Sequence, residues 1–284
     1  MERISLFIRH KTGHSLGAWL ASLFVLVFII IQLVPLFFVA SNSMKTKDAY
    51  LESVYALPDD PYWGNYEKLL TEYNFPQMFK NSIFLTLVSV LVTGYLGAMA
   101  AFAVSKFSFK GRGLINILIL PLMSIPGVIL LIPLFVLFSA FKMTNSLWVV
   151  VIIYIGLLLP FTMNILSSFM NSVPSSLLEA SMLDGCGFLR MFNKIVFPLV
   201  IPGFSAASIV NAMWIWNELL IVFVFTQDEA KRTLILGLTS LQGLYNLDVP
   251  LLMAGAAITS APMILLFVLS QKWFIRGLIA GGEK

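Results

Sequence analysis

The stretch "EASMLDGCGFLRMFNKIVFPLVIP", residues 179–202, decides how this chain is organised. It interrupts an otherwise apolar sequence with four charged residues, which are Glu179, Asp184, Arg190 and Lys194. The pair Asp184-Gly185, with Gly187 after it, ends a first short helix, because glycine readily adopts positive φ. Apolar residues then return at helical spacing until two prolines lead into the next apolar run. The stretch therefore predicts two short helices at an angle. They are too polar to span a membrane and too apolar to be fully exposed to solvent.

The composition places the chain in a bilayer. It has 284 residues, of which 59% are hydrophobic and 11% are charged, whereas ordinary soluble domains carry roughly 25% charged residues. A soluble protein of this length could not bury so much apolar surface. The single cysteine, Cys186, excludes a disulfide within the chain.

Six apolar stretches are long enough for transmembrane helices, which need about 20 residues each. We predict an all-α membrane protein whose spans cover residues 16–40, 81–104, 114–140, 147–169, 200–225 and 251–274. The first stretch is too long for the apolar core of a signal peptide, so we expect it to remain as a helix. Several prolines fall inside the spans, which indicates a packed bundle around a cavity rather than isolated anchors.

The charges of the connecting segments predict the orientation. With both termini on one side, that side carries eleven Lys or Arg residues against four acids, and the other side carries seven against nine. Short cytoplasmic loops of membrane proteins are enriched in Lys and Arg, so both termini are predicted to be cytoplasmic. The basic excess is then explained by topology and requires no nucleic-acid partner.

The predicted organisation has four parts, which are a cytoplasmic N-terminus (1–15), the first span with an extracytoplasmic loop (16–76), a core (77–272) that contains the cytoplasmic loop 171–199, and a cytoplasmic tail (273–284). The outer segment 41–80 is polar and carries the aromatic cluster "YWGNY". It is either an interfacial cap anchored by Tyr and Trp or a docking surface for an external partner.

Periodicity alone leaves the loop 171–199 open between a helix pair lying on lipid and a docking element. Its residue pattern is more specific. Glu-Ala-small, then Gly, then Ile-x-x-Pro resembles the "EAA" loop of permease subunits of ATP-binding-cassette (ABC) importers. The matching positions are Glu179, Ala180, Ser181, Asp184, Gly185, Cys186, Ile195 and Pro198. Ser181 and Cys186 depart from the usual alanines, but both are small.

The resemblance covers nearly the whole chain. The stretches "WGNYEKLL", "WIWNELL" and "LLMAGAAITSAPMILLFVLSQKWFIRGLIAGGEK" look like the carbohydrate-uptake branch of these permeases, and in particular like the six-span partner of maltose-type importers. The resemblance implies the type I ABC importer fold, a bacterial cell membrane and a sugar or oligosaccharide as cargo. The tail "LIAGGEK" is less regular than in the family, which leaves its contacts in doubt.

The resemblance also implies a mechanism and partners. In the family, the loop is a coupling helix that docks on a cytoplasmic ATPase subunit. The chain is then expected to assemble with a second permease subunit as a heterodimer, two ATPase subunits and an extracytoplasmic sugar-binding protein, all around a core in membrane lipid. ATP and Mg²⁺ would bind the ATPase subunits. This chain has no GxxxxGK[ST] phosphate loop, so we expect it to be neither an enzyme nor the holder of a cofactor.

The fifth span holds a second candidate site. Its polar and aromatic residues are costly in lipid and are Asn211, Trp214, Trp216, Asn217 and Glu218. They are interpreted either as the lining of a translocation path or as a hydrogen-bond network that holds helices together. The family implies that the companion permease carries most of the defined sugar contacts.

Three other functions compete with this interpretation. A permease of the same superfamily for a non-sugar solute differs only in specificity, which the sequence does not fix. A secondary transporter would be expected to show paired repeats and charges at the midplane, yet only Glu218 is available for such a role. A membrane enzyme would need a cluster of nucleophiles, His or carboxylates at one membrane face, and none is apparent.

Overall fold

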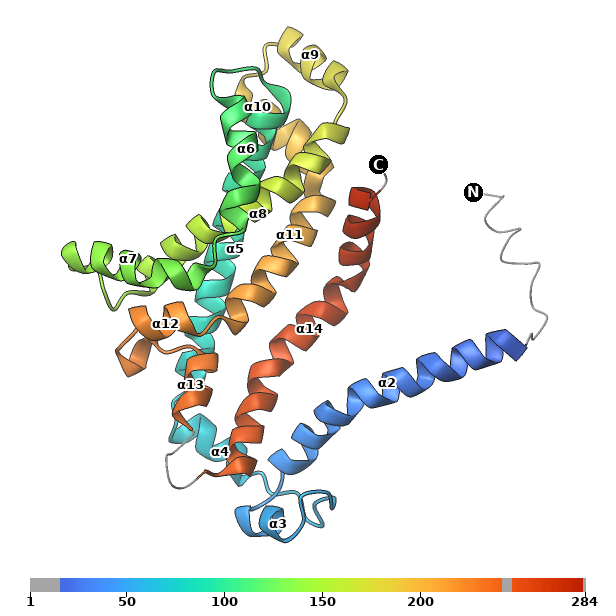
Figure 1. Ribbon diagram of the computed structural model, residues 1–284, viewed down its shortest axis with the longest axis vertical. Coiled ribbons are helices and arrows are strands. Elements are labelled where there is room, and N and C mark those ends of the chain that lie inside the picture. Colours follow the sequence, from blue (N-terminus) through green and yellow to red (C-terminus); the bar gives the residue numbers. More distant parts are fainter. Residues whose placement is uncertain (1–15, 242–246, 283–284) are drawn as a thin grey trace. The chain divides into compact units, whose positions relative to one another are not determined.

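The computed structural model describes residues 16–241 and 247–282. Within these ranges the chain is helical and contains no strand, which confirms the all-α prediction (Figure 1). The elements are α2 (Leu16–Ser43), α3 (Lys47–Glu52), α4 (Gly64–Thr71), α5 (Phe75–Lys106), α6 (Arg112–Met123), α7 (Gly127–Ala140), α8 (Leu147–Ser172), α9 (Ser175–Leu183), α10 (Phe188–Met191), a π-helical segment (Phe192–Val196), α11 (Phe197–Asn217), α12 (Leu220–Phe225), a 3-10 turn (Glu229–Lys231), α13 (Leu234–Ser240) and α14 (Val249–Gly282). The predicted cytoplasmic N-terminus, 1–15, lies outside the described residues, as do 242–246 and the last two residues of the predicted tail.

Five helices are long and apolar enough to cross a membrane, and α6 with α7 supplies a sixth crossing if the pair is counted as one span. The five are Trp19–Ser43, Phe75–Lys106, Leu147–Ser172, Phe188–Asn217 and Val249–Lys272. The count agrees with the six-span prediction. The helices extend beyond the predicted bounds because they continue past the apolar windows into polar ends.

The third predicted span, 114–140, is not one straight helix. It is divided into α6 and α7, which meet at 104°. The break falls at Ser124–Pro126, where Pro126 has no N–H to donate and also disfavours helical geometry at the preceding residue. Hydropathy averages over the break and therefore does not detect it.

The fifth predicted span, 200–225, is displaced toward the N-terminus. The helical run begins at Phe188 and ends at Asn217, and the separate helix α12 starts at Leu220. Glu218 has an extended backbone, so the apolar residues after it form their own short helix. The second half of the interrupting stretch is thus continuous with the span that follows.

The chain divides into two compact units, and most of the spans lie in the unit made of Lys68–Leu247 and Ile258–Lys284. Its core is built where α5 packs along α8 and α11 packs against both. Glycines make the approach close: a Cβ on Gly97 would lie 2.7 Å from Thr162 Cγ2, and one on Gly94 would lie 2.5 Å from the Phe204 ring. Small residues of this kind let membrane helices pack closely.

The other unit comprises the chain up to Glu67 together with Asp248–Ala257. Its loop after α2 is held by Asn65, whose buried amide Nδ2 donates to the carbonyl oxygens of Ser43 (2.9 Å) and Lys45 (2.8 Å). The hydroxyls of Ser43 and Tyr66 lie 2.8 Å apart, within hydrogen-bonding distance. The predicted outer cap is therefore an ordered element with its own polar interior.

Candidate coupling loop and membrane cavity

The turn after α9 is a Schellman motif centred on Gly185. The N–H of Gly185 donates to Met182 O (3.0 Å), and the N–H of Cys186 donates to Ser181 O (2.9 Å). This pattern places a residue with left-handed backbone after the helix, and Gly185 has φ of 72°. A Cβ at this position would meet nothing within 4 Å. Conformation, and not crowding within the chain, is what demands glycine here.

The predicted coupling residues differ in where their side chains lie. Glu179, Ala180 and Asp184 are exposed on α9 and the turn. Ser181 is 5% exposed, and its hydroxyl donates to Leu178 O (2.7 Å). It therefore packs α9 against the rest of the chain and does not contribute to an exposed surface.

Sequence reasoning missed two apolar residues of this surface. Leu183 is 89% exposed and Met182 is 50% exposed, directly before Asp184. A single exposed leucine is ordinary, but these side chains stand beside Glu179 of α9 and Asp184 of the turn, whose carboxylates form no ion pair among the described residues. The sequence "SMLDG" could have indicated this exposure. Its apolar pair occupies the last turn of α9, directly before the glycine turn.

The helix resumes through a π-helical segment, Phe192–Val196, before α11 begins. The N–H of Phe197 donates to Phe192 O, five residues earlier. Pro198 follows at the start of α11, and it supplies no N–H to the carbonyl four residues before it, which favours the wider turn. Of the predicted residues here, Ile195 is half-buried and Pro198 is exposed. Single π turns inside helices occur frequently at functional sites.

A cluster of aromatic rings ties the loop to α5. The ring of Phe102 lies 5.2 Å from that of Phe188 and 5.7 Å from that of Phe192, between centroids. The Tyr95 hydroxyl also donates to Asn193 Oδ1 (3.0 Å). Because these contacts link α10 and the π segment to one membrane helix, a displacement of the loop must also move α5 or break them.

Two of the five candidate path residues line a cavity. Asn211 and Trp214 of α11 face a space of about 480 Å³ whose other walls include the break between α6 and α7. Asn211 is buried, and its Nδ2 donates to Thr162 Oγ1 (2.8 Å). Its Oδ1 has no hydrogen-bond partner among the described residues. The cavity is thus lined by an amide residue and by an indole, which are residue types suited to a hydroxyl-bearing ligand.

Trp216 and Asn217 do not line this cavity. Trp216 is 4% exposed, and its Nε1 donates to Thr259 O (2.9 Å) of α14. Asn217 is exposed, and its Nδ2 donates to Met213 O (2.8 Å) within its own helix. Trp216 and Asn211 each make a hydrogen bond to another helix, and Asn211 and Trp214 line the cavity.

Glu218 joins two helices rather than lining the cavity. Its Oε2 accepts from the Tyr154 hydroxyl of α8 (2.9 Å). Both carboxyl oxygens accept from the backbone N–H of Ile221 (3.0 Å each), in the first turn of α12. The N–H of Val222 also donates to Oε2 (3.4 Å). First-turn N–H groups have no partner inside their own helix, so Glu218 satisfies two of them and fixes the corner between α11 and α12.

Replacement of Glu218 by glutamine is expected to destabilise the protein by about 1 kcal/mol. Glutamine keeps one acceptor oxygen but loses the stronger bonds that a charged acceptor makes. The measurement is the thermal unfolding midpoint in detergent, with Tyr154→Phe as the partner variant. In a double-mutant cycle the two changes should cost less together than their sum. Additive costs would show that the Tyr154–Glu218 bond contributes nothing.

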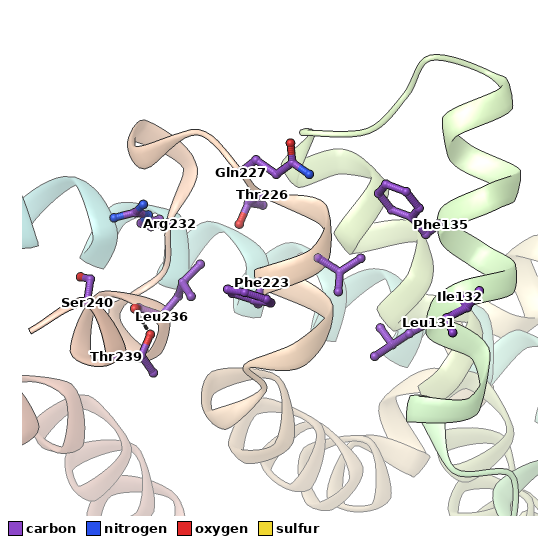
Figure 2. Close-up of a pocket in the computed structure, with 11 residues that line it drawn as sticks. Leu131, Ile132, Phe135, Phe223, Thr226, Gln227, Arg232, Leu236, Thr239 and Ser240 are labelled. Atoms are coloured by element: carbon purple, nitrogen blue, oxygen red, sulfur yellow. Dashed lines mark hydrogen bonds between the residues drawn. The ribbon is translucent and has the colours of Figure 1, made fainter. Parts of the chain in front are cut away.

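A second cavity, of about 760 Å³, lies between α7, α12 and α13. Figure 2 shows Leu131, Ile132 and Phe135 on one wall and Leu236, Thr239 and Ser240 on the opposite one. None of the five candidate path residues lines it. No sequence pattern predicts this cavity, because its walls come from α12 and from α7, which follows the break in the third span.

Comparison with known families gives a match over most of the chain. The model of the family described as "Binding-protein-dependent transport system inner membrane component" matches residues 93–280. This range includes the loop, the π segment and the cavity of Asn211.

Relatives match the chain over most of its length. The chain is 30% identical to the diacetylchitobiose uptake system permease protein NgcG of Streptomyces coelicolor, over 87% of this chain and 83% of that protein. It is 28% identical to the arabinooligosaccharides transport system permease protein AraQ of Bacillus subtilis, over 98% and 99%. It is 29% identical to the melibiose/raffinose/stachyose import permease protein MelC of Bacillus subtilis, over 88% and 91%.

Solved structures share the fold. A bacterial ABC transporter involved in the import of the acidic polysaccharide alginate matches with a TM-score of 0.81 at 20% identity, over 93% of this chain and 99% of that chain. A bacterial alginate ABC transporter in complex with an alginate pentasaccharide-bound periplasmic protein matches with a TM-score of 0.63 at 16% identity, over 90% and 95%.

Proposed function

Because this chain belongs to the family of binding-protein-dependent transport system inner membrane components, we propose that it is the permease subunit of an ABC importer whose cargo is a sugar or oligosaccharide. The assignment of the cargo is supported by three relatives. They are named for diacetylchitobiose, for arabinooligosaccharides, and for melibiose, raffinose and stachyose. The chain is a multi-pass membrane protein and has the fold of a transporter subunit.

Coupling to ATP is proposed to run through the loop 171–199. Glu179 and Asp184 present carboxylates that can form charge-assisted hydrogen bonds with a partner. Leu183 beside them offers apolar contact area. We assign the partner as a cytoplasmic ATPase subunit that binds ATP and Mg²⁺, two copies of which serve this chain and a second permease subunit. This chain itself would hydrolyse nothing, and both its termini would be cytoplasmic.

The geometry supports a transport cycle in which the loop moves with the membrane helices. Closure of the ATPase pair would draw the loops together, and domain rocking of this kind is a known class of transition. The aromatic contacts of Phe102 would carry the displacement to α5. Asn211 and Trp214 would then form part of the path, after an extracytoplasmic sugar-binding protein delivers the cargo.

The test combines uptake with isolation of the assembly. Cells lacking this chain should lose ATP-dependent uptake of labelled raffinose, arabinotriose or N,N′-diacetylchitobiose, and the restored chain should recover it. Mass spectrometry of the chain isolated in mild detergent should show an ATPase subunit and a second permease. Recovery of the chain alone, able to move substrate without ATP, would contradict the proposal. Loss of uptake for a non-sugar solute only would retain the importer and replace the cargo.

A further inference from the structure

The loop between α2 and α4 encloses a small pocket of its own, distinct from both membrane cavities. It measures about 360 Å³ and lies within the range of small-molecule sites, which is about 300–1,000 Å³. One wall is the start of α3 with Lys45 before it, and the other is the segment 58–63. All of these residues lie in one compact unit.

The pocket is held in shape by buried polar contacts. Lys45 is 2% exposed, and its Nζ donates to the carbonyl oxygens of Ser53 (2.9 Å) and Val54 (3.3 Å). The N–H of Tyr62 donates to Met44 O (2.8 Å) and draws the two walls together. An ammonium group has three donors, so one remains beyond the two that close the loop. Burial also lowers the pKa of Lys45 below its ordinary value.

The opposite wall of the pocket carries two carboxylate residues and a tryptophan ring. Asp59 and Asp60 are exposed, and their carboxylates form no ion pair among the described residues. Trp63 is 61% exposed, and its ring packs on one side against that of Tyr66 at 5.6 Å between centroids. The pocket lining therefore includes a buried lysine, two exposed carboxylate residues and an exposed indole.

We propose that this pocket is a peripheral saccharide site, formed by Lys45, Asp59, Asp60 and Trp63. The assignment rests on the proposed function for its ligand class. An anion would meet two carboxylates, and a simple cation would meet the buried ammonium group. A neutral polyhydroxyl ligand satisfies both, because each hydroxyl donates and accepts, and its C–H face can lie against the indole. The site would hold the cargo outside the membrane before it enters the path.

The test is sugar binding to the permease complex without its binding protein, in lipid nanodiscs, by saturation-transfer difference NMR. The probes are raffinose, arabinotriose and N,N′-diacetylchitobiose. Trp63→Ala and the double change Asp59→Asn with Asp60→Asn should each weaken binding of the recognised sugar by about tenfold or more. Trp63→Phe should retain most of it. Tyr55→Ala is the matched control, because Tyr55 is exposed in the same loop but does not line the pocket.

Three outcomes would overturn the site. The first is that none of the three sugars binds the wild-type complex, although cells still take one of them up. The second is that Trp63→Ala and Tyr55→Ala bind sugar as the wild type does. The third is that Trp63→Ala weakens only the capture of the binding protein, which would assign the pocket to protein docking. Failure of the proposed function differs from all three, because uptake of every sugar would then be independent of this chain.

Discussion

Replacement of Gly185 by valine is expected to reduce ATP-dependent uptake by roughly tenfold or more while the chain still inserts in the membrane. The residue has φ of 72°, and left-handed backbone costs about 1–2 kcal/mol for an L-residue, with the β-branched side chain of valine at the upper end. The chain would escape this cost by unwinding the turn, which would displace Asp184 and Leu183. Uptake of labelled sugar and recovery of the ATPase subunit with the chain are the two measurements.

Gly187→Val provides the matched control. Gly187 lies two residues further on, and a Cβ there also meets nothing within 4 Å, but its φ is −71°. This variant should keep most of the uptake, and Gly185→Asn should fall between the two, because asparagine tolerates the left-handed region. Equal losses at Gly185 and Gly187 would show that bulk against a partner, and not the backbone, sets the requirement.

Replacement of Trp216 by alanine is expected to lower the free energy of unfolding by about 3–5 kcal/mol, the range for a large buried aromatic residue. The variant leaves a cavity beside Phe79, whose ring packs edge-on at 6.2 Å between centroids. It also leaves Thr259 O without the indole donor that now lies at 2.9 Å. The readouts are the thermal unfolding midpoint in detergent and the amount of folded protein in membranes.

Trp214→Ala separates stability from transport. Trp214 is 40% exposed and lines the membrane cavity, so its removal should cost only about 1 kcal/mol but change the rate or the sugar preference of uptake. The two tryptophans are thus expected to have opposite profiles. If Trp214→Ala unfolds the protein while Trp216→Ala leaves it intact, the division of the fifth span between path and scaffold is wrong.

Much of the fold follows from hydropathy, since the spans over α5, α8 and α14 need only a long apolar run. The break in the third span and the corner at Glu218 do not follow, because each depends on one residue within an apolar window. Pro126 removes a donor, and Glu218 captures the N–H of Ile221. A hydropathy average detects neither effect, because each comes from a single residue.

The candidate loop was the more predictable of the two sites. A glycine after a short helix predicts a turn from local backbone chemistry alone, and the structure places that turn at Gly185. The side chain of Ser181 could not be oriented in this way, because which face of α9 is buried depends on packing. The contacts of Asn211 and Trp216 also depend on which neighbouring helix each one meets, so residues in and beside one motif, "WIWNELL", lie in different surroundings.

The π-helical segment Phe192–Val196 contains one more residue in its turn than an α-helix would, between the loop and α11. In an α-helix each residue advances about 1.5 Å and turns about 100°. If the segment returned to α-helical hydrogen bonding, α9 would rotate by about that angle relative to α11. Such a change would therefore turn the carboxylates of Glu179 and Asp184 relative to α11.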